Sequence, residues 1–371
     1  MEPVTHFLTG ACIGRSGLNR KTRYATVVAV LAAEAADLDV LWGFAGPVEE
    51  LKHHRGFTHT FLGAPVVAGL VFGVFWLVHL WRERRRNRSA TQDAKAPTAR
   101  PRQPVHWGWL YLTALIAALS HILLDWSNNY GVHPFFPFND RWYAGSFEFI
   151  YDPVVWAILL LALIMPWIFG LVDREIGVRR KPFRGRGWAI FALCSLAALG
   201  CLRWWQHGEA ITMVRNSGVV SAPIDRIAAE PYPTNPFHWR VLVETPRFYQ
   251  TAEVNTWSHS VSSDPHQNVL YKPTVTPAVE AAKRTLLGRV YGDWGRWAIV
   301  QDVGQEPMAA MKPPQLPRGR TWTTVIFSDL RFRYGPFASR GGSRHSPLSG
   351  WVYIVDGRYP AGEGMGRHVQ P

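Results

Sequence analysis

An imidazole and a carboxylate stand four residues apart at the end of a long apolar segment. His121 and Asp125 close the run Trp107–Leu124, and this spacing puts both side chains on one face of a helix. Ionisable groups inside a membrane are costly unless they pair, line a wet cavity or hold a metal. The two residues could hold a cation, or they could form a hydrogen bond that caps the helix end.

Two other apolar segments carry groups of the same kind. Glu34, Asp37 and Asp39 interrupt one of them, and His53, His54 and His59 lie at the head of another. Imidazole and carboxylate together suit a borderline divalent cation, with Zn²⁺ the first choice. The proposed metal ligands, or their immediate support, are His6, Asp37, Asp39, His54, His59, His121 and Asp125. One ion with supporting residues and two ions sharing a carboxylate both remain open.

Some of these residues have simpler explanations. His6 could be an ordinary core or interfacial histidine, and we expect His53 to be solvated in a polar loop. Glu34 could pair with an arginine or line the site, and it is left unassigned. Proton relays in transporters use the same residue types, so a relay without a metal is an alternative.

Arg55 and Thr58 lie between the histidines and are the proposed catalytic residues. A bound divalent cation lowers the pKa of water towards about 7 and makes hydroxide available as a nucleophile. Arg55 would stabilise an oxyanion or phosphate, and Thr58 would add a weaker hydrogen bond. Both could instead anchor the membrane interface.

The segments that must position these groups have the composition of membrane helices. Span-length runs occur at Tyr24–Phe44, Phe57–Trp81, Trp107–Leu124, Pro153–Val172 and Trp188–Trp205, many with tryptophan at an end. Residues 3–15 form a helix too short to cross a hydrocarbon core of about 30 Å. The sequence therefore predicts an α-helical polytopic membrane bundle over residues 1–205, with about four or five transmembrane helices plus a short N-terminal helix.

The loops between the apolar runs differ in charge. Segments 15–23, 82–106 and 173–187 are basic, whereas segments 46–57 and 125–152 taken together carry more acids than bases. The positive-inside rule places the basic loops in the cytoplasm, and the other loops and everything after about residue 206 outside. We expect Arg82–His106, a polar and highly charged linker, to be disordered.

A hairpin turning near Asn19–Lys21 would bring His6 and Asp37 to one depth. His59 begins the following span and His121 ends the next one, so the candidate ligands could converge near the outer leaflet. Asp37 and Asp39 are two residues apart and cannot share a regular helical face. Either the helix breaks there or one of the two carboxylates only supports the site.

Residues 206–371 read as a soluble extracytoplasmic domain of α+β or mostly β structure. Pro277–Tyr291 has helical spacing, and the last stretch, Arg358–Pro371, shows no pattern and is expected to fray. Segments rich in β-branched and aromatic residues predict strands at Arg240–Glu244, Thr256–Val261, Arg296–Val300, Thr321–Phe327 and Trp351–Val355.

Charge and cysteine content narrow the functional classes. The formal net charge of +13 could indicate nucleic-acid binding, but the basic residues of the first half are concentrated in short loops between apolar runs. We therefore expect the lipid bilayer as a partner, and not nucleic acid. The three cysteines lie in apolar segments and form neither a disulfide framework nor a Cys-x-x-Cys metal site. No cleavable signal peptide is predicted.

Four motifs resemble those of a known family when they are taken together and in order. They are PVTHFLTG at residues 3–10, ADLDVL at 36–41, HRGFTHT at 54–60 and SHILLD at 120–125. They are similar to the YdjM-type membrane-bound metal-dependent hydrolases, also described as LexA-binding, inner-membrane-associated hydrolases. The family often has proline where this chain has Ala36 and serine where it has Thr60, and neither change removes a candidate ligand.

The resemblance implies a bacterial inner-membrane protein with a hydrolase label. We accordingly expect metal-dependent hydrolysis of a lipid-derived ester or a phosphoester. The alternative is a non-enzymatic transporter or envelope scaffold, whose polar cluster is a proton relay or a structural metal site. A DNA-related role through the basic loops, which the family's LexA-binding name suggests, comes third.

Overall fold

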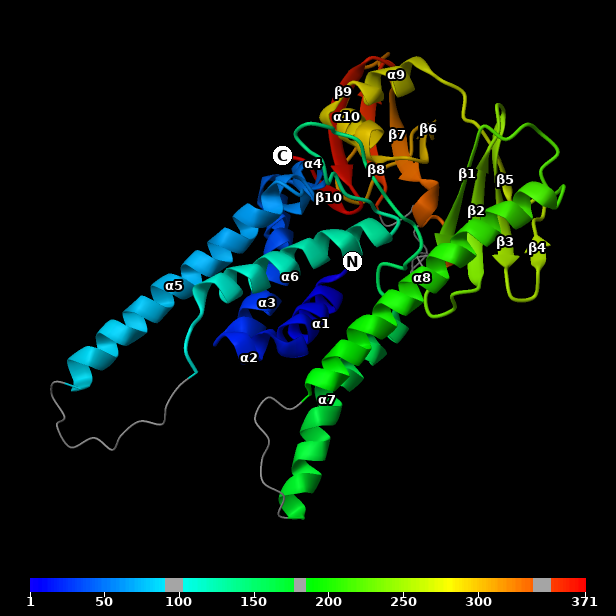
Figure 1. The fold of residues 1–371 in the computed structure, drawn as a ribbon. Helices are drawn as coiled ribbons and strands as arrows, with labels where there is room; N and C mark the ends of the chain where they lie inside the picture. The colour runs from blue at the N-terminus through cyan, green and yellow to red at the C-terminus, as the bar shows by residue number, and fades with distance from the viewer. Residues whose placement is uncertain (91–102, 177–184, 336–347) are drawn as a thin grey trace. The chain divides into compact units, whose positions relative to one another are not determined.

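Figure 1 shows the computed structural model of the chain, which describes residues 1–90, 103–176, 185–335 and 348–371. Contacts divide the chain into two compact units. The first comprises Met1–Leu38 and Arg55–Leu202, and the second comprises Asp39–His54 and Arg203–Pro371. The sequence analysis expects two separate domains, residues 1–205 and 206–371. That expectation stays a prediction.

Four helices in the described part of the chain are long and apolar enough to cross a membrane. They are α5 (Gly63–Ala90), α6 (Trp107–Ser127), α7 (Pro153–Glu175) and α8 (Arg186–Asn216). Helices able to span a membrane are therefore confirmed, and four of them lie in the described residues. The linker expected at Arg82–His106 begins as the last turns of α5, and its residues 91–102 lie outside the described segments.

The apolar run Tyr24–Phe44 is not one helix. It forms α3 (Ala25–Glu34) and continues as the 3-10 helix η2 (Ala35–Ala45). Before it come α1 (Pro3–Ile13), the π-helical turn η1 (Gly14–Leu18) and α2 (Asn19–Lys21). At about 1.5 Å per residue, α1 and α3 are each roughly 15 Å long, about half the thickness of a bilayer core. Neither helix alone can span a membrane.

Small residues let α1 and α3 pack closely against each other. A Cβ atom on Gly10 would lie 2.8 Å from the carbonyl oxygen of Ala29, and one on Gly14 would lie 2.5 Å from the Cα of Thr26. The facing side of α3 is likewise made of small residues, including Ala29 and Ala33. Any larger side chain at the two glycines would push the helices apart and move the polar residues that they carry.

Helix α6 presents one buried face to the rest of the first unit, beside α1 and α3 in Figure 1. Leu110, Ala114 and Ala117 of this face pack in a core with α3. His121 and Asp125 continue the same stripe towards the end of the helix, and both are fully buried. The helical repeat that buries the apolar residues therefore also buries the two polar ones.

The turn between α1 and α3 meets the start of α6. The His106 backbone N–H donates to the hydroxyl of Thr22 at 2.9 Å, and the Arg23 N–H donates to the carbonyl of Pro104 at 3.2 Å. Since His121 and Asp125 close α6, the basic segment 15–23 and the polar pair lie at opposite ends of this helix.

The second unit contains two antiparallel five-stranded sheets. The first has the order β1-β2-β3-β4, with β5 also paired to β3, and its strands are β1 (Arg226–Pro231), β2 (His238–Glu244), β3 (Phe248–Asn255), β4 (Ser260–Ser262) and β5 (Val269–Tyr271). The second has the order β10-β9-β8-β7-β6, and its strands are β6 (Ala298–Asp302), β7 (Trp322–Asp329), β8 (Gly350–Val355), β9 (Tyr359–Met365) and β10 (His368–Val369). A C-terminal β-sheet domain is thus confirmed.

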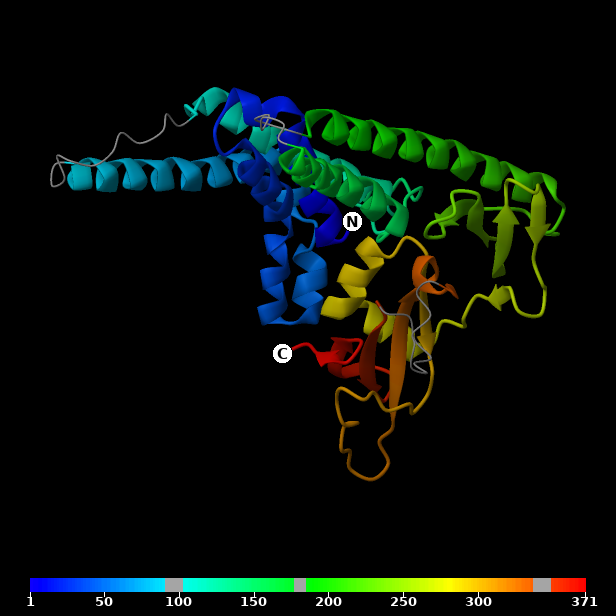
Figure 2. The same cartoon turned by 90° about the horizontal axis from the view of Figure 1, so that it is seen from below.

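Short helices complete the second unit. In Figure 2 the yellow pair α9 (Pro277–Lys283) and α10 (Leu286–Trp294) lies against the orange and red strands of the second sheet. The helix expected at Pro277–Tyr291 is divided because Thr285 caps the start of α10, accepting a hydrogen bond from the Gly288 N–H. The unit also contains α4 (Pro47–His53) and the 3-10 helix η4 (Leu330–Phe332).

Two sequence expectations for this unit were wrong. The predicted strand Thr256–Val261 is mostly the turn between β3 and β4, because the Asn255 side chain accepts hydrogen bonds from the N–H groups of Trp257 and Ser258. Arg358–Pro371 is not frayed. It forms β9 and β10, and the Gln370 side chain accepts from the Val48 N–H at 2.9 Å.

A buried ion pair lies in the interior of the second unit. Arg331 and Asp329 are both fully buried, and the Arg331 Nη2 and Asp329 Oδ2 atoms lie 2.9 Å apart. Burial opposes the charge on Arg331, but the neighbouring Asp329 carboxylate outweighs it and raises the pKa of the guanidinium. The pair therefore remains charged in the protein interior.

Candidate metal centre

Four donor atoms from separate elements of the first unit meet at one point. Asp37, His59, His121 and Asp125 each contribute one atom, and all four atoms lie within 4.8 Å of one another. We refer to these residues as the donor cluster. Asp37 lies on η2, His59 on the 3-10 turn η3 (Phe57–His59), and the other two on α6.

The spacing within the donor cluster is that of ligands around one small cation. Each His Nε2 lies 3.3–3.4 Å from Asp37 Oδ1 and 3.3 Å from Asp125 Oδ2, and the two Nε2 atoms are 2.9 Å apart. Tetrahedral zinc with bonds of about 2.0–2.1 Å separates its ligand atoms by roughly 3.3 Å. The residues present therefore fit a zinc ion or a cation of similar size.

Both imidazoles are held from the side opposite the cluster. The Nδ1 of His121 donates to the carbonyl of Ala33 at 2.6 Å, and the Nδ1 of His59 lies 3.1 Å from the hydroxyl of Thr58. Such contacts fix the ring orientation and direct the other nitrogen to a metal. Thr58, proposed from the sequence as a substrate contact, is placed by the structure behind a histidine.

His6 lies beside the donor cluster. Its ring stacks on that of His121 with centroids 3.7 Å apart, and its Nε2 is 3.4 Å from Asp125 Oδ1. The side chain is fully buried, and neither ring nitrogen makes a hydrogen bond to any residue that the structure describes. A buried imidazole with unused bonding capacity is unusual unless something else occupies the space, so His6 also fits a site that holds a cation.

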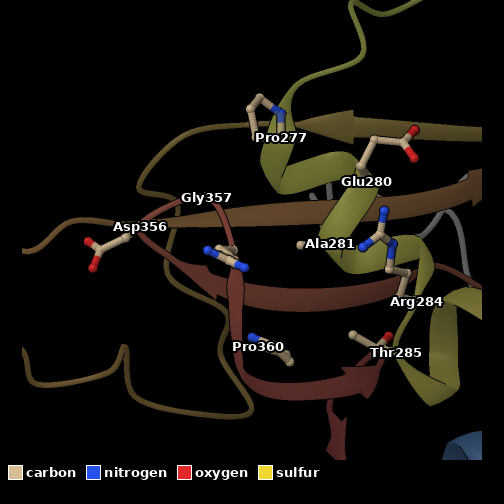
Figure 3. Close-up of a pocket in the computed structure, with 9 residues that line it drawn as sticks. Pro277, Glu280, Ala281, Arg284, Thr285, Asp356, Gly357 and Pro360 are labelled. Carbon is tan, nitrogen blue, oxygen red and sulfur yellow. The ribbon is translucent and has the colours of Figure 1, made fainter.

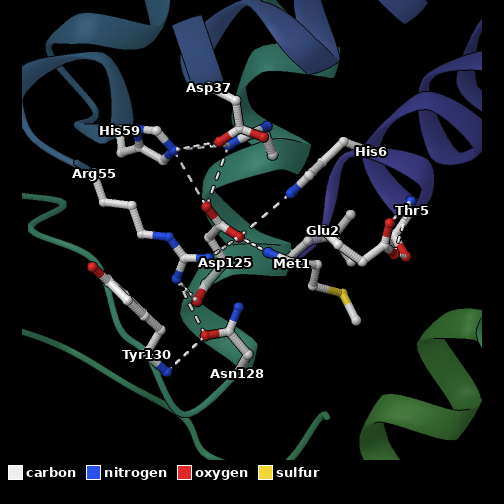
Figure 4. Close-up of polar contacts among 12 residues, drawn as sticks. Met1, Glu2, Thr5, His6, Asp37, Arg55, His59, Asp125, Asn128 and Tyr130 are labelled. Carbon is white, nitrogen blue, oxygen red and sulfur yellow. Dashed lines mark hydrogen bonds and ion pairs between the residues drawn. The ribbon is translucent and has the colours of Figure 1, made fainter. Parts of the chain in front are cut away.

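The guanidinium of Arg55 makes hydrogen bonds to protein groups around Asp125 (Figure 4). Its Nη2 donates to Asp125 Oδ1 at 2.9 Å, and its Nη1 donates to Asn128 Oδ1 at 3.2 Å and to the carbonyl of Gly131 at 3.0 Å. The guanidinium also lies 4.6 Å from the centre of the Tyr130 ring. Because Arg55 is 4% exposed, its geometry is that of a group that positions Asp125.

Asn128 was not singled out by the sequence reasoning. It follows the last residue of α6, accepts from Arg55 and also accepts from the Tyr130 N–H at 2.8 Å. A polar residue immediately after a helix that carries a candidate ligand was the available signal. The amino nitrogen of Met1 contacts Asp125 as well, as Figure 4 shows.

The structure does not bring Asp39 and His54 into the donor cluster. They belong to the second unit and pair with each other, with Asp39 Oδ1 3.1 Å from His54 Nδ1. Asp37 and Asp39 are two residues apart on η2, so their side chains point in different directions and have different partners. His53 stacks on Trp42 and lies 3.3 Å from the Glu49 carboxylate, at a partly exposed position.

Glu34 is the last residue of α3, and among the described residues it has no arginine partner. It lies outside the four apolar helices. Burial and the neighbouring carboxylates Asp37 and Glu2 raise the pKa of its carboxyl to about 7. The sequence allowed Glu34 either to pair with an arginine or to line the site. The structure favours the second alternative, a position near the donor cluster.

The second unit has a separate surface cavity of about 520 Å³ between α9 and the turn from β8 to β9 (Figure 3). Its carboxylates already have cationic partners. Glu280 pairs with Lys283 at 3.0 Å, and Asp356 pairs with Arg320 at 2.7 Å. Because the remaining charges are exposed arginines, we assign no chemistry to this cavity.

The fold and the site define a helical membrane protein that carries a histidine and aspartate cluster in its helical unit. A profile of the YdjM inner membrane protein family matches residues 1–210, more than half of the chain. The chain therefore belongs to this family of inner membrane proteins. All residues of the donor cluster lie within the matched part.

Another comparison finds the uncharacterized protein YfhP of Bacillus subtilis strain 168. It is 28% identical over 178 residues, which is 46% of this chain and 47% of the relative. The chain thus spans about half the length of the curated relative that it matches. No solved structure matches the chain.

Proposed function

We propose that this protein is a membrane-bound metal-dependent hydrolase whose active site is the donor cluster. The main observation behind this proposal is that two imidazole nitrogens and two carboxylate oxygens surround one point. Each nitrogen lies 2.9–3.4 Å from the other nitrogen and from the two oxygens. Mixed nitrogen and oxygen donors favour zinc over magnesium or calcium, which prefer oxygen alone. When bound, the ion would supply an acidified water as nucleophile.

The surrounding residues have separate roles in this proposal. Arg55 holds Asp125 and places a positive charge next to any anion that develops at the cluster. Thr58 orients His59, and the Ala33 carbonyl orients His121. His6 is a further ligand or supports the stacked ring of His121. With His6 facing Asp125 Oδ1, a second ion sharing that carboxylate is the two-ion version of the proposal.

Exposed aromatic side chains beside the cluster support a lipid-derived substrate. Phe57, on the same short turn as His59, is 43% exposed, and Phe61 is 51% exposed. Phe61 contacts the ring of the exposed Phe135 at 5.5 Å, and its N–H donates to the Pro134 carbonyl. An apolar rim next to buried polar groups suits a molecule with an acyl chain and an ester or phosphoester head.

The orientation in the membrane is also a proposal. It is supported by the separation of the basic segment 15–23 and the donor cluster at opposite ends of α6. If the basic end is cytoplasmic, the cluster lies towards the outer leaflet and the second unit lies outside the cytoplasm.

One observation favours a second candidate function. A site in which four protein ligands surround the cation leaves no coordination position open, which is typical of structural zinc sites. A scaffold or transporter could contain such a structural site. The side chain of Asp37, however, is 20% exposed, whereas His59, His121 and Asp125 are fully buried. The cluster is therefore open on the side of Asp37, as a catalytic site must be.

Metal content and hydrolysis, measured on the detergent-purified protein, test the proposal together. The substrates are short-chain and long-chain p-nitrophenyl esters and bis-p-nitrophenyl phosphate. We expect wild type to contain about one or two ions and to hydrolyse at least one substrate, and Asp37→Ala to lose both properties. His53→Ala, which changes a partly exposed histidine outside the cluster, is the control. Stoichiometric metal without any hydrolysis would favour the structural-site alternative.

A further inference from the structure

Glu34 lies next to the donor cluster along the chain. It precedes Asp37 by three residues and follows Ala33, whose carbonyl accepts the His121 hydrogen bond. Its charge interacts with Asp37, with Glu2 and with the amino nitrogen of Met1, which itself contacts Asp125. The carboxyl group is therefore close to the cluster without belonging to it.

Glu34 also has unused hydrogen-bonding capacity. Its Oε1 atom is buried and has no hydrogen-bond partner among the described residues. The neighbouring Glu2 is fully engaged, since it accepts from the Thr5 N–H at 3.1 Å and from the Trp156 indole N–H at 2.7 Å. A buried carboxylate oxygen without a protein partner indicates that water or a ligand is its partner.

The position of Glu34 is not explained by helix stability. It lies where α3 passes into η2, and burial disfavours the charged form of its carboxyl. No described cation offsets this cost in an ion pair. A residue that is unfavourable locally and lies beside a candidate active site is better explained by chemistry there.

We infer that Glu34 is the proton acceptor for the attacking water in the proposed hydrolysis; this inference rests on the proposed function. The Glu34 carboxylate takes a proton as the water O–H bond breaks, and the oxygen bonds to the carbonyl carbon or phosphorus of the ester. Glu34 then returns the proton to the leaving alkoxide as its bond to that centre breaks. Water and ester are consumed, an acid and an alcohol are formed, and Glu34 is regenerated.

The half-buried environment suits this role. A carboxyl whose pKa is raised to about 7 can both accept and return a proton near neutral pH. Asp37 and Asp125 cannot do so if they hold the cation, and the surface carboxylate Glu49 is already paired with Lys52 at 3.0 Å.

The test compares Glu34→Gln and Glu34→Asp with wild type, and uses Glu49→Gln as the matched control. Metal content is measured first. The pH midpoint of the visible absorption of the cobalt(II)-loaded proteins is measured next, because it follows ionisation of water at the ion. We expect Glu34→Gln to keep its metal and to lower the midpoint by about one pH unit, since a neighbouring negative charge is lost. Hydrolysis should fall about 100-fold or more in Glu34→Gln and only partly in Glu34→Asp.

The outcomes separate this inference from the proposed function. An unchanged midpoint in Glu34→Gln, or an unchanged rate, would overturn the role of Glu34 while leaving the metal site intact. Loss of the metal from Glu34→Gln would also overturn it, because Glu34 would then be a ligand. Wild type that binds no metal would instead refute the proposed function itself. If no test substrate is hydrolysed, the pH midpoint of the cobalt(II) absorption still decides whether Glu34 has this role.

Discussion

The Nε2 atoms of His59 and His121 lie 2.9 Å apart, and each ring is held from behind by a protein oxygen. The Ala33 carbonyl can only accept, so His121 carries its proton on Nδ1 and directs a lone pair forwards. If Thr58 accepts from His59 in the same way, two lone pairs and two carboxylate oxygens face one point. Such an arrangement is repulsive without a cation, which is why we place a metal ion there.

Removing the hydrogen bond behind His59 should weaken metal binding without removing a ligand. We expect Thr58→Val to lower the affinity for zinc about 10-fold, because the ring would no longer be oriented by its Nδ1 contact. Thr58→Ser keeps the hydroxyl and should bind like wild type. Competition with a chromophoric chelator measures both affinities, and equal affinities for the two variants would contradict the proposed orientation role.

Arg55 should be needed for stability as well as for the site. Arg55→Ala leaves the buried carboxylate of Asp125 without its guanidinium, a change that typically costs about 3–5 kcal/mol. Arg55→Lys keeps the charge but loses the two-pronged contact with Asp125 and Asn128, so a smaller loss is expected. Thermal unfolding in detergent gives the ranking. A wild-type melting temperature for Arg55→Ala would show that the contact contributes little.

The close packing of α1 on α3 predicts a distant effect on the site. Gly14→Ala would put a Cβ atom 2.5 Å from the Cα of Thr26, an overpacking that costs about 1–3 kcal/mol. The helices would separate, and His6 and Asp37 would lose their registration. Gly69→Ala on α5, with nothing within 4 Å of the new atom, is the control. Metal affinity should fall in Gly14→Ala only. An equal metal affinity in the two variants would argue against a link between the packing of α1 on α3 and the metal site.

The proposed orientation can be tested with single cysteines in a background lacking Cys12, Cys194 and Cys201. Ser258→Cys lies in the exposed turn between β3 and β4, and Arg20→Cys lies on α2. We expect a membrane-impermeant maleimide applied to spheroplasts to label the first position and not the second. The reverse pattern would place the second unit in the cytoplasm.

Local patterns in the sequence predicted the parts of the site that depend on one helix. His121 and Asp125 share a buried face of α6 because they are four residues apart, as the spacing predicted. The hairpin that brings α1 alongside α3 also followed from the sequence, because a turn at Asn19–Lys21 separates two apolar runs.

Other features depend on tertiary contacts that no local pattern reveals. The two-residue spacing of Asp37 and Asp39 separates their directions, but only the tertiary structure shows that Asp37 is the one that joins the donor cluster. Arg55 has a positive φ of 57° and turns inward to Asp125, which its neighbours in the sequence do not indicate. Similarly, β9 contains proline and glycine, and its strand conformation comes from pairing with β8.

Elemental analysis of the detergent-purified wild-type protein beside His121→Ala tests the central claim most directly. Wild type should carry about one or two zinc or similar ions per chain, and the variant, still folded by circular dichroism, should lose them because one donor is gone. His53→Ala should keep the wild-type content. A wild-type protein free of bound cation, or an equal metal content in His121→Ala, would contradict the metal centre.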